Sequence, residues 1–138
     1  MLTFSTSIRV RYGETDQMGF CYYGNYAQFL EVGRVEALRS CGFSYKELES
    51  QGVLLPVRSF SIKYVSPAKY DDTLEIQTSI IKMEGTRIEF SYVVKTNEGV
   101  LIANALTELV FVSADSLRPI PMPEKFKKLA QKIDGDNK

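Results

Sequence analysis

Residues 12–26, Tyr12-Gly-Glu-Thr-Asp-Gln-Met-Gly-Phe-Cys-Tyr-Tyr-Gly-Asn-Tyr26, join the first strand pattern of the chain to its longest helix pattern. From Gly13 to Gly24 the stretch is polar and contains glycines, which predicts a loop. Asn25 then stands at a favourable N-cap position, and Gln28 three residues later has the spacing of a capping box. The stretch therefore predicts a loop that leads directly into the N-terminus of a helix.

Apolar and small residues recur at spacings of three and four after this loop, which is the period of an amphipathic helix. They are Tyr26, Phe29, Leu30, Gly33, Ala37, Leu38 and Cys41. Gly42 is placed to end this helix. Because Gly33 and Ala37 are small, we expect a neighbouring backbone to come close to the apolar face, as when a sheet wraps around a helix.

The rest of the chain consists mainly of strand patterns. Apolar and polar residues alternate from Phe4 to Tyr12, which predicts a half-buried strand. Further strands are expected at 54–66, 74–80, 88–94 and 100–112, the last apolar on both faces and therefore central in the sheet. Turns are expected at Gly85 and at 96–99, short helices at 44–51 and 124–133, and a frayed tail at 134–138.

The order of elements is a strand, a long helix and then four strands joined mainly by tight turns. This order favours an α+β fold in which an antiparallel five-stranded sheet packs on one long central helix. A chain of 138 residues is expected to form a single domain, residues 1–138. One such sheet cannot enclose the helix on both sides, so we expect a homodimer that joins or packs two sheets.

Composition excludes several classes of partner. Seventeen basic residues balance seventeen acidic ones, so nothing indicates a nucleic-acid partner. No apolar run reaches the roughly 18 residues of a membrane span, and the N-terminus lacks the regions of a signal peptide. We therefore expect a protein of the cytoplasm.

The chain contains no histidine. This excludes a Ser-His-Asp or Cys-His relay and removes the commonest zinc ligand, so no metal site is expected. Cys21 and Cys41 are expected to be free thiols in a reducing cytosol. A nucleophilic role for Cys21 is disfavoured, because no histidine is present to activate it. If the protein is a hydrolase, its base or nucleophile must be a carboxylate, a tyrosine or a lysine.

The loop and helix carry a family resemblance. The segment from Arg11 to Tyr26, followed by Phe29-Leu-Glu-Val-Gly-Arg34, resembles the signature of the 4-hydroxybenzoyl-CoA thioesterase family. The similarity continues through Val57-Arg-Ser-Phe-Ser-Ile-Lys-Tyr-Val-Ser-Pro-Ala-Lys-Tyr-Asp-Asp72, and the order of elements matches from about residue 3 to 126. The resemblance implies a hotdog fold that hydrolyses acyl-CoA at the interface of a homodimer or homotetramer, without a cofactor beyond the coenzyme A of the substrate.

The resemblance also assigns catalytic residues. Asp16 matches the catalytic aspartate, acting as nucleophile or general base, and N–H groups near Tyr23 and Gly24 match the oxyanion site. Physical chemistry agrees, because a helix start offers unpaired N–H groups where a thioester oxygen gains charge. The alternative for Asp16 is a turn residue, and the rival carboxylate Glu14 is expected to be a solvated loop charge.

Three further positions leave alternatives open. Glu31 either pairs with Arg34 or faces solvent, or it is a second carboxylate that positions water or substrate. Tyr22 and Tyr26 are expected to form a pocket wall or part of the core. The commoner family pattern has histidine where this chain has Tyr23, so the acyl preference of histidine-bearing members does not transfer.

Coenzyme A carries phosphates, which require basic groups near the pocket rim. The candidates for substrate binding are Arg58, Lys63, Lys82 and Arg87, with the Thr86 hydroxyl, and their alternative is ordinary surface charge. Three functions remain: hydrolysis of a small acyl- or aroyl-CoA, hydrolysis of an acyl carrier protein thioester, or non-catalytic binding of acyl-CoA. A hotdog dehydratase is disfavoured, because those enzymes generally use a histidine.

Overall fold

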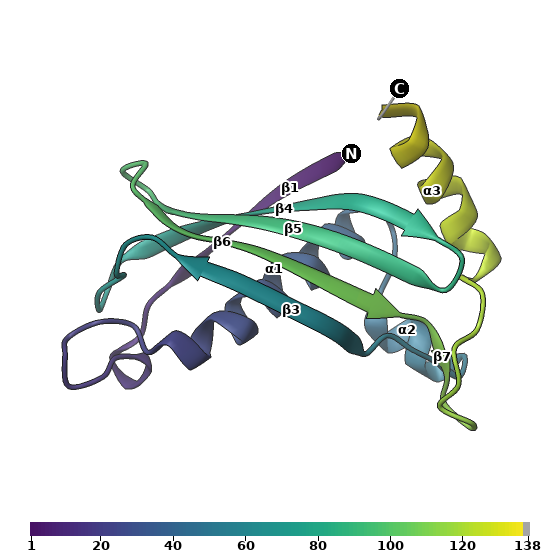
Figure 1. Cartoon of the computed structure of the whole chain (residues 1–138), viewed down its shortest axis with the longest axis horizontal. Coiled ribbons are helices and arrows are strands. Elements are labelled where there is room, and N and C mark those ends of the chain that lie inside the picture. Colours follow the sequence, from purple (N-terminus) through teal and green to yellow (C-terminus); the bar gives the residue numbers. More distant parts are fainter. Residues whose placement is uncertain (137–138) are drawn as a thin grey trace.

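The computed structural model describes residues 1–136 as a five-stranded antiparallel sheet in the order β1-β4-β5-β6-β3, with the long helix α1 across one face (Figure 1). The strands are β1 (Leu2–Arg9), β2 (Val53–Leu54), β3 (Val57–Tyr64), β4 (Thr73–Glu84), β5 (Arg87–Thr96), β6 (Leu101–Val110) and β7 (Val112–Ser113). The helices are α1 (Tyr26–Ser40), α2 (Tyr45–Ser50) and α3 (Glu124–Asp136), with the 3₁₀ turns η1 (Tyr12–Glu14) and η2 (Tyr23–Asn25). The predicted α+β fold class is confirmed.

Several element boundaries differ from the prediction; β4 continues past 80 to Glu84, and the strand expected at 100–112 is divided into β6 and β7. The first strand ends at Arg9, because residues 12–14 form the turn η1 and leave Tyr12 exposed. The strand expected at 54–66 is two strands, β2 and β3, separated at Leu55 and Pro56. The last helix continues to Asp136 instead of ending at 133, and residues 137–138 of the expected frayed tail lie outside the described residues.

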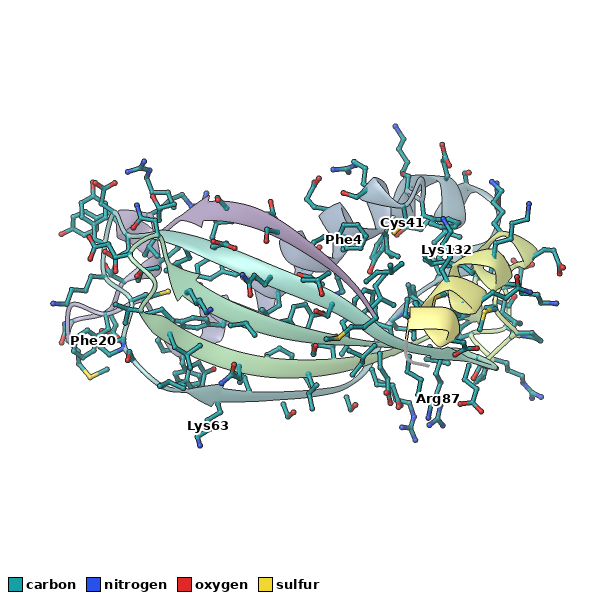
Figure 2. All side chains as sticks on the ribbon, turned by 90° about the horizontal axis from the view of Figure 1, so that it is seen from above. Phe4, Phe20, Cys41, Lys63, Arg87 and Lys132 are labelled. Carbon is teal, nitrogen blue, oxygen red and sulfur yellow. The ribbon has the colours of Figure 1, made fainter. Side chains whose placement is uncertain are left out.

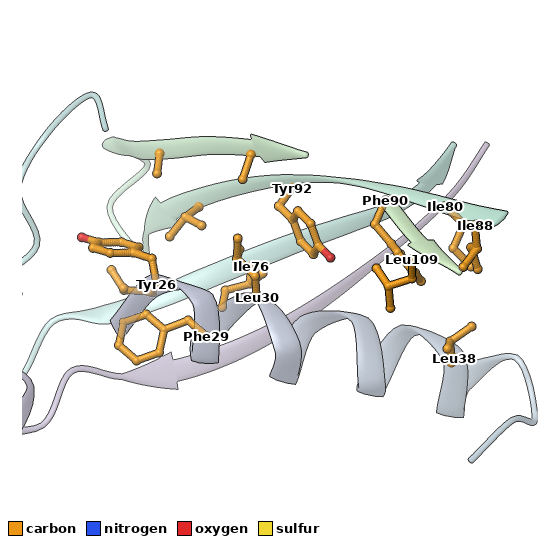
Figure 3. Close-up of a cluster of buried hydrophobic side chains, with 14 of the residues drawn as sticks. Tyr26, Phe29, Leu30, Leu38, Ile76, Ile80, Ile88, Phe90, Tyr92 and Leu109 are labelled. Atoms are coloured by element: carbon orange, nitrogen blue, oxygen red, sulfur yellow. The ribbon is translucent and has the colours of Figure 1, made fainter. Parts of the chain in front are cut away.

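Close contact between α1 and β4 defines the core (Figure 3). Tyr26, Phe29, Leu30 and Leu38 of α1 face buried side chains of the sheet such as Ile76, Ile80, Phe90 and Leu109. At Gly33, an added Cβ would lie 2.5 Å from Thr78 Oγ1 and 2.9 Å from Ile76 Cγ2. The predicted close approach of a strand at Gly33 is therefore confirmed.

The two ends of α1 differ in how well the sequence predicts them. Gly42, with a φ of 90°, follows the C-cap residue, and Phe43 N–H donates to Leu38 O, as expected for a glycine-terminated helix. At the other end, the predicted cap and capping box at Asn25 are wrong. The turn η2 runs into α1 without an extended residue, and the Asn25 side chain instead donates to Glu14 O at 2.8 Å.

One side of the sheet remains open in a single chain. The strand expected to be buried on both faces, β6, lies inside the sheet, but Leu106 on its outer face is 51% exposed. The edge strand β3 lies beyond α1, which packs on β1 and β4, and its residues Phe60 and Tyr64 are 40% and 45% exposed. Among residues 1–136, no helix is long and apolar enough to cross a membrane.

Candidate active site

A pocket of about 270 Å³ lies beside the first turn of α1, at the end of the sheet where β3 ends. The loop before α1 forms it by pairing with the chain after β3: Cys21 N–H donates to Ala68 O at 2.7 Å, and Phe20 pairs with Lys69. The pocket is lined by Asp16, Met18, Phe20, Cys21, Tyr23, Tyr26, Tyr64, Val65, Ser66 and Pro67. Its wall is thus mostly apolar and aromatic around one carboxylate.

Asp16 is half-buried in this wall. Its Oδ1 accepts a hydrogen bond from Met18 N–H at 2.9 Å, which is an Asx turn, and its main chain pairs with Phe20 and Gly19. The described residues offer no hydrogen bond to Oδ2. The side chain therefore supports the turn with one oxygen and leaves the other available to a molecule in the pocket.

The N–H groups of Tyr23 and Gly24 open the turn η2, directly before α1. Within residues 1–136 neither N–H donates to a main-chain acceptor, as expected at the first positions of a helical segment. An added Cβ at Gly24 would lie 2.7 Å from Cε2 of Tyr22, so the Tyr22 ring covers this glycine closely. Two unpaired N–H groups are thus available beside the Asp16 pocket.

Glu14 differs from its expectation as a solvated charge, because it is only 7% exposed. Its carboxylate accepts from Arg11 N–H at 2.7 Å and from the Arg11 guanidinium at 2.9 Å, and this hydrogen bonding lowers the pKa of Glu14. Its main-chain oxygen accepts from Tyr22 N–H and from the Asn25 side chain, both at 2.8 Å. Glu14 therefore holds the turn η2 in place.

Tyr23, Tyr26 and Tyr64 line the pocket, whereas Tyr22, predicted in the pocket wall or the core, is 46% exposed and lies outside the lining, because its ring packs on Tyr23 instead. The Tyr22 and Tyr23 rings lie 4.7 Å apart, and the Tyr64 ring lies 6.3 Å from Tyr23 and 5.3 Å from Tyr26. Tyr26 is buried in the core, and burial raises the pKa of its phenol. Burial also raises the pKa of the neighbouring Cys21 thiol to about 11, so this thiol is protonated at neutral pH.

Glu31 is exposed on α1 and does not line the pocket. Among the described residues no ion pair joins it to Arg34, so that alternative is wrong, whereas the solvent-facing alternative matches the structure. The Arg34 side chain is buried instead beneath α1, beside the phenols of Tyr45 and Tyr92, whose pKa values burial raises.

Most of the residues expected to bind phosphates at the pocket rim lie elsewhere in a single chain, and only Lys63, which precedes the pocket residue Tyr64, lies near it. Lys82, Thr86 and Arg87 line a second pocket of about 430 Å³ around the β4–β5 turn. Figure 2 places Arg87 at the opposite end of the molecule from Phe20 and Lys63. Glu108 binds both Arg58 at 2.7 Å and Arg87 at 3.4 Å, so acidic groups lie among these cations.

The motif identified three pocket residues, Asp16, Tyr23 and Tyr26, but it did not identify Cys21 or Tyr64 as neighbours of Asp16. Cys21 lies in the same stretch as Asp16, and the bridge between Thr15 and Cys21 brings the two together. Tyr64 lies in the second stretch that carries the resemblance, and the pairing of residues 20–21 with 68–69 brings that stretch to the first. Within the part of the chain described, no group of three or more acidic or cysteine side chains could hold a metal ion.

A five-stranded antiparallel sheet around one long helix, with a carboxylate beside the start of that helix, defines a hotdog-fold protein with a candidate hydrolytic site. The sequence profile of the thioesterase-like superfamily matches residues 10–129. The chain belongs to this superfamily and is a thioester hydrolase, which confirms the predicted family and reaction class.

Individual relatives agree with this assignment. The acyl-CoA thioester hydrolase YbgC of Escherichia coli O6:H1 is 36% identical over 121 residues, which are 88% of this chain and 90% of YbgC. The crystal structure of DHNA-CoA thioesterase from Staphylococcus aureus superposes with a TM-score of 0.92 at 31% sequence identity. The matched residues are 100% of this chain and 97% of that protein. A 4-hydroxybenzoyl-CoA thioesterase structure has the same fold, with a TM-score of 0.84 at 24% sequence identity. The matched residues are 93% of this chain and 98% of that protein.

Proposed function

We propose that this protein hydrolyses a small acyl- or aroyl-CoA thioester to the free acid and coenzyme A, with Asp16 as nucleophile or general base. The observation that carries the proposal is the Asp16 carboxylate in an apolar pocket beside the unpaired N–H groups of Tyr23 and Gly24. Acyl-CoA hydrolysis by YbgC, a relative over most of its length, supports the same substrate class.

The chemistry requires few groups. Attack on the thioester carbonyl puts negative charge on its oxygen, and the N–H groups at the start of η2 stabilise that charge. The carbon–sulfur bond then breaks, and the leaving thiolate is weakly basic, so a strong general acid is not needed. The attacking atom is either an Asp16 oxygen, which gives a mixed anhydride that water cleaves, or a water oxygen whose proton Asp16 accepts.

Binding of the coenzyme is proposed to involve more than one copy of the chain. A strand of ten residues such as β5 spans about 33 Å, so Lys82, Thr86 and Arg87 cannot line the Asp16 pocket of their own chain. In a homodimer or homotetramer, these residues of one copy, with Arg58 and Lys63, would bind phosphates of a substrate held by the other. Tyr22, Tyr23 and Tyr26 would contact the acyl group, and Glu31 would contribute only at such an interface.

Replacing Asp16 tests the catalytic assignment. Asp16→Asn keeps an oxygen to accept from Met18 N–H, so the turn persists while the carboxylate is lost. We expect thiol release from acyl-CoA to fall by about 10²- to 10⁴-fold. Asp115→Asn, at an exposed turn away from the pocket, is the matched control and should keep full activity. Unchanged hydrolysis by Asp16→Asn would exclude the proposed role.

Heavy-oxygen water tests the anhydride mechanism. After single-turnover hydrolysis in this solvent, label in the Asp16 peptide indicates an anhydride that water cleaves at the Asp16 carbon, whereas label only in the product acid indicates that water attacks the acyl carbon, of the thioester or of an anhydride. A panel of acetyl-, hexanoyl- and benzoyl-CoA, with the matching acyl carrier protein thioesters, identifies the preferred acyl group and carrier. Sedimentation analysis distinguishes dimer from tetramer, and cell fractionation tests the proposed cytoplasmic location.

A further inference from the structure

A hydrogen bond connects the far end of β3 to the turn that starts α1. The phenol of Tyr64, the last residue of β3, donates to the main-chain oxygen of Tyr23 at 3.1 Å, although the two residues are 41 positions apart. The same oxygen accepts the N–H of Tyr26, the first residue of α1. Burial raises the pKa of Tyr64, so the phenol is protonated and able to donate at neutral pH.

The acceptor matters because of the group to which it is bonded. The carbonyl of Tyr23 and the N–H of Gly24 belong to one planar peptide unit, in which the C=O and N–H bonds point in opposite directions. A donor held on the carbonyl oxygen therefore restrains the rotation of the plane and the direction of the N–H. It also polarises the unit, which makes the N–H a stronger donor.

We propose that Tyr64 is a positioning residue for thioester hydrolysis, which orients and polarises the Tyr23–Gly24 peptide unit so that Gly24 N–H can bind the thioester oxygen. This proposal rests on the proposed function. In this role Tyr64 does not touch the reacting atoms, because the phenol acts on them only through the carbonyl of Tyr23.

The surroundings of the turn agree with this role. On the other side of η2, Glu14 O accepts from Tyr22 N–H and from the Asn25 side chain, both at 2.8 Å. Asn25 N–H donates to Tyr22 O at 3.0 Å, which joins the two peptide units that flank the Tyr23–Gly24 unit. The Tyr64 phenol restrains the unit between them. The turn is thus held from two sides, by the loop before it and by β3.

Tyr64→Phe removes the hydroxyl and retains the ring that contacts Tyr23 and Tyr26. With the acyl-CoA of the panel that is hydrolysed fastest, we expect kcat to fall about threefold to tenfold, which corresponds to one hydrogen bond, while KM changes less than about twofold. Tyr70→Phe is the matched control, because Tyr70 is an exposed tyrosine whose ring pairs with Tyr12 outside the pocket. It should leave kcat and KM unchanged.

A spectroscopic measurement distinguishes positioning from a general loss of structure. The chain has nine glycines, so glycine-selective ¹⁵N labelling gives a simple amide spectrum in which Gly24→Ala identifies the Gly24 signal. Tyr64→Phe should move the amide proton of Gly24 upfield while the distant Gly85 and Gly99 signals stay in place. Tyr70→Phe should leave all of these signals unmoved.

The outcomes are separable from those of the proposed function. If Asp16→Asn abolishes hydrolysis but Tyr64→Phe keeps the wild-type kcat, or leaves the Gly24 signal in place, the positioning role is overturned and the proposed function stands. If the wild-type protein releases no thiol from any member of the panel, both are overturned. A lower kcat together with a moved Gly24 signal supports the proposal.

Discussion

Replacing Gly33 by alanine should destabilise the protein even though alanine is the better helix former. The new Cβ would lie 2.5 Å from Thr78 Oγ1, where ordinary contact begins at 3.4 Å, so α1 and β4 would have to separate by about 0.9 Å. Neither side can move easily, because Thr78 and Ile76 are fully buried and β4 lies between β1 and β5. The contact therefore sets the distance between α1 and the sheet.

Two opposing terms set the magnitude. Overpacking in a core costs about 1–3 kcal/mol, and we expect the upper part of that range because both partners are rigid. Replacing glycine by alanine inside a helix stabilises the helix by about 1 kcal/mol, which offsets part of this cost. The net loss should be about 1–2 kcal/mol in the free energy of unfolding, or about 3–8 °C in Tm for a chain of this size.

Urea denaturation and calorimetry at one fixed protein concentration measure this effect. Gly135→Ala in α3 is the matched control, because no atom lies within 4 Å of its added Cβ, and it should be neutral or slightly stabilising. Adding Thr78→Ala to Gly33→Ala removes Oγ1 and should recover about 1 kcal/mol of coupling energy. If Gly33→Ala raises Tm as a simple helix substitution would, the close contact is not present in solution.

Three further predictions concern single interactions. Glu14→Gln should cost about 1 kcal/mol above the unfolded pKa of Glu14, because Arg11 lowers the folded pKa beneath that value. The difference from wild type should shrink as the pH falls below the unfolded pKa and vanish below the lower folded pKa; denaturation curves in which it persists in strong acid would contradict this. Tyr92→Phe should cost about 1–3 kcal/mol in urea denaturation, since it breaks the buried 2.7 Å hydrogen bond to Thr107 Oγ1, and adding Thr107→Val should recover part of the loss. Burial raises the pKa of Cys21 to about 11, so this thiol should react with iodoacetamide at pH 8 on the order of 10² times more slowly than a free thiol. Mass spectrometry follows the reaction, and equal rates in the folded and the urea-unfolded protein would refute the burial of Cys21.

Periodicity predicted the fold because each element has a regular side-chain pattern. The spacings of three and four along α1 and the alternation along β4 and β5 correspond to one buried face each. The burial of β6 was overestimated, since an apolar outer residue such as Leu106 looks the same in sequence whether a second copy or solvent covers it. Local patterns report the character of a face but not what lies against it.

In the candidate site, too, the sequence predicted the residues of one local stretch but not the contacts that folding creates. The motif placed Asp16 and Tyr23 in one stretch, and the structure brings both to one pocket. Glu14 was expected in solvent, because a carboxylate in a glycine-containing loop usually lies there, whereas the turn η1 brings Arg11 back onto it. The Tyr64–Tyr23 hydrogen bond spans 41 positions and has no local signature, so only the folded chain reveals it.

The arrangement of donors also suggests how such a site is adjusted. The groups proposed to bind the oxyanion are main-chain N–H groups, which substitution of a side chain cannot exchange for another chemical group. Their direction and strength can still change through Tyr64, whose phenol holds the adjoining Tyr23 carbonyl, and through the Glu14 main-chain oxygen, which holds Tyr22 N–H. Removing the Tyr64 hydroxyl leaves its ring in the pocket wall, so the strength of oxyanion binding can vary separately from the shape of that wall.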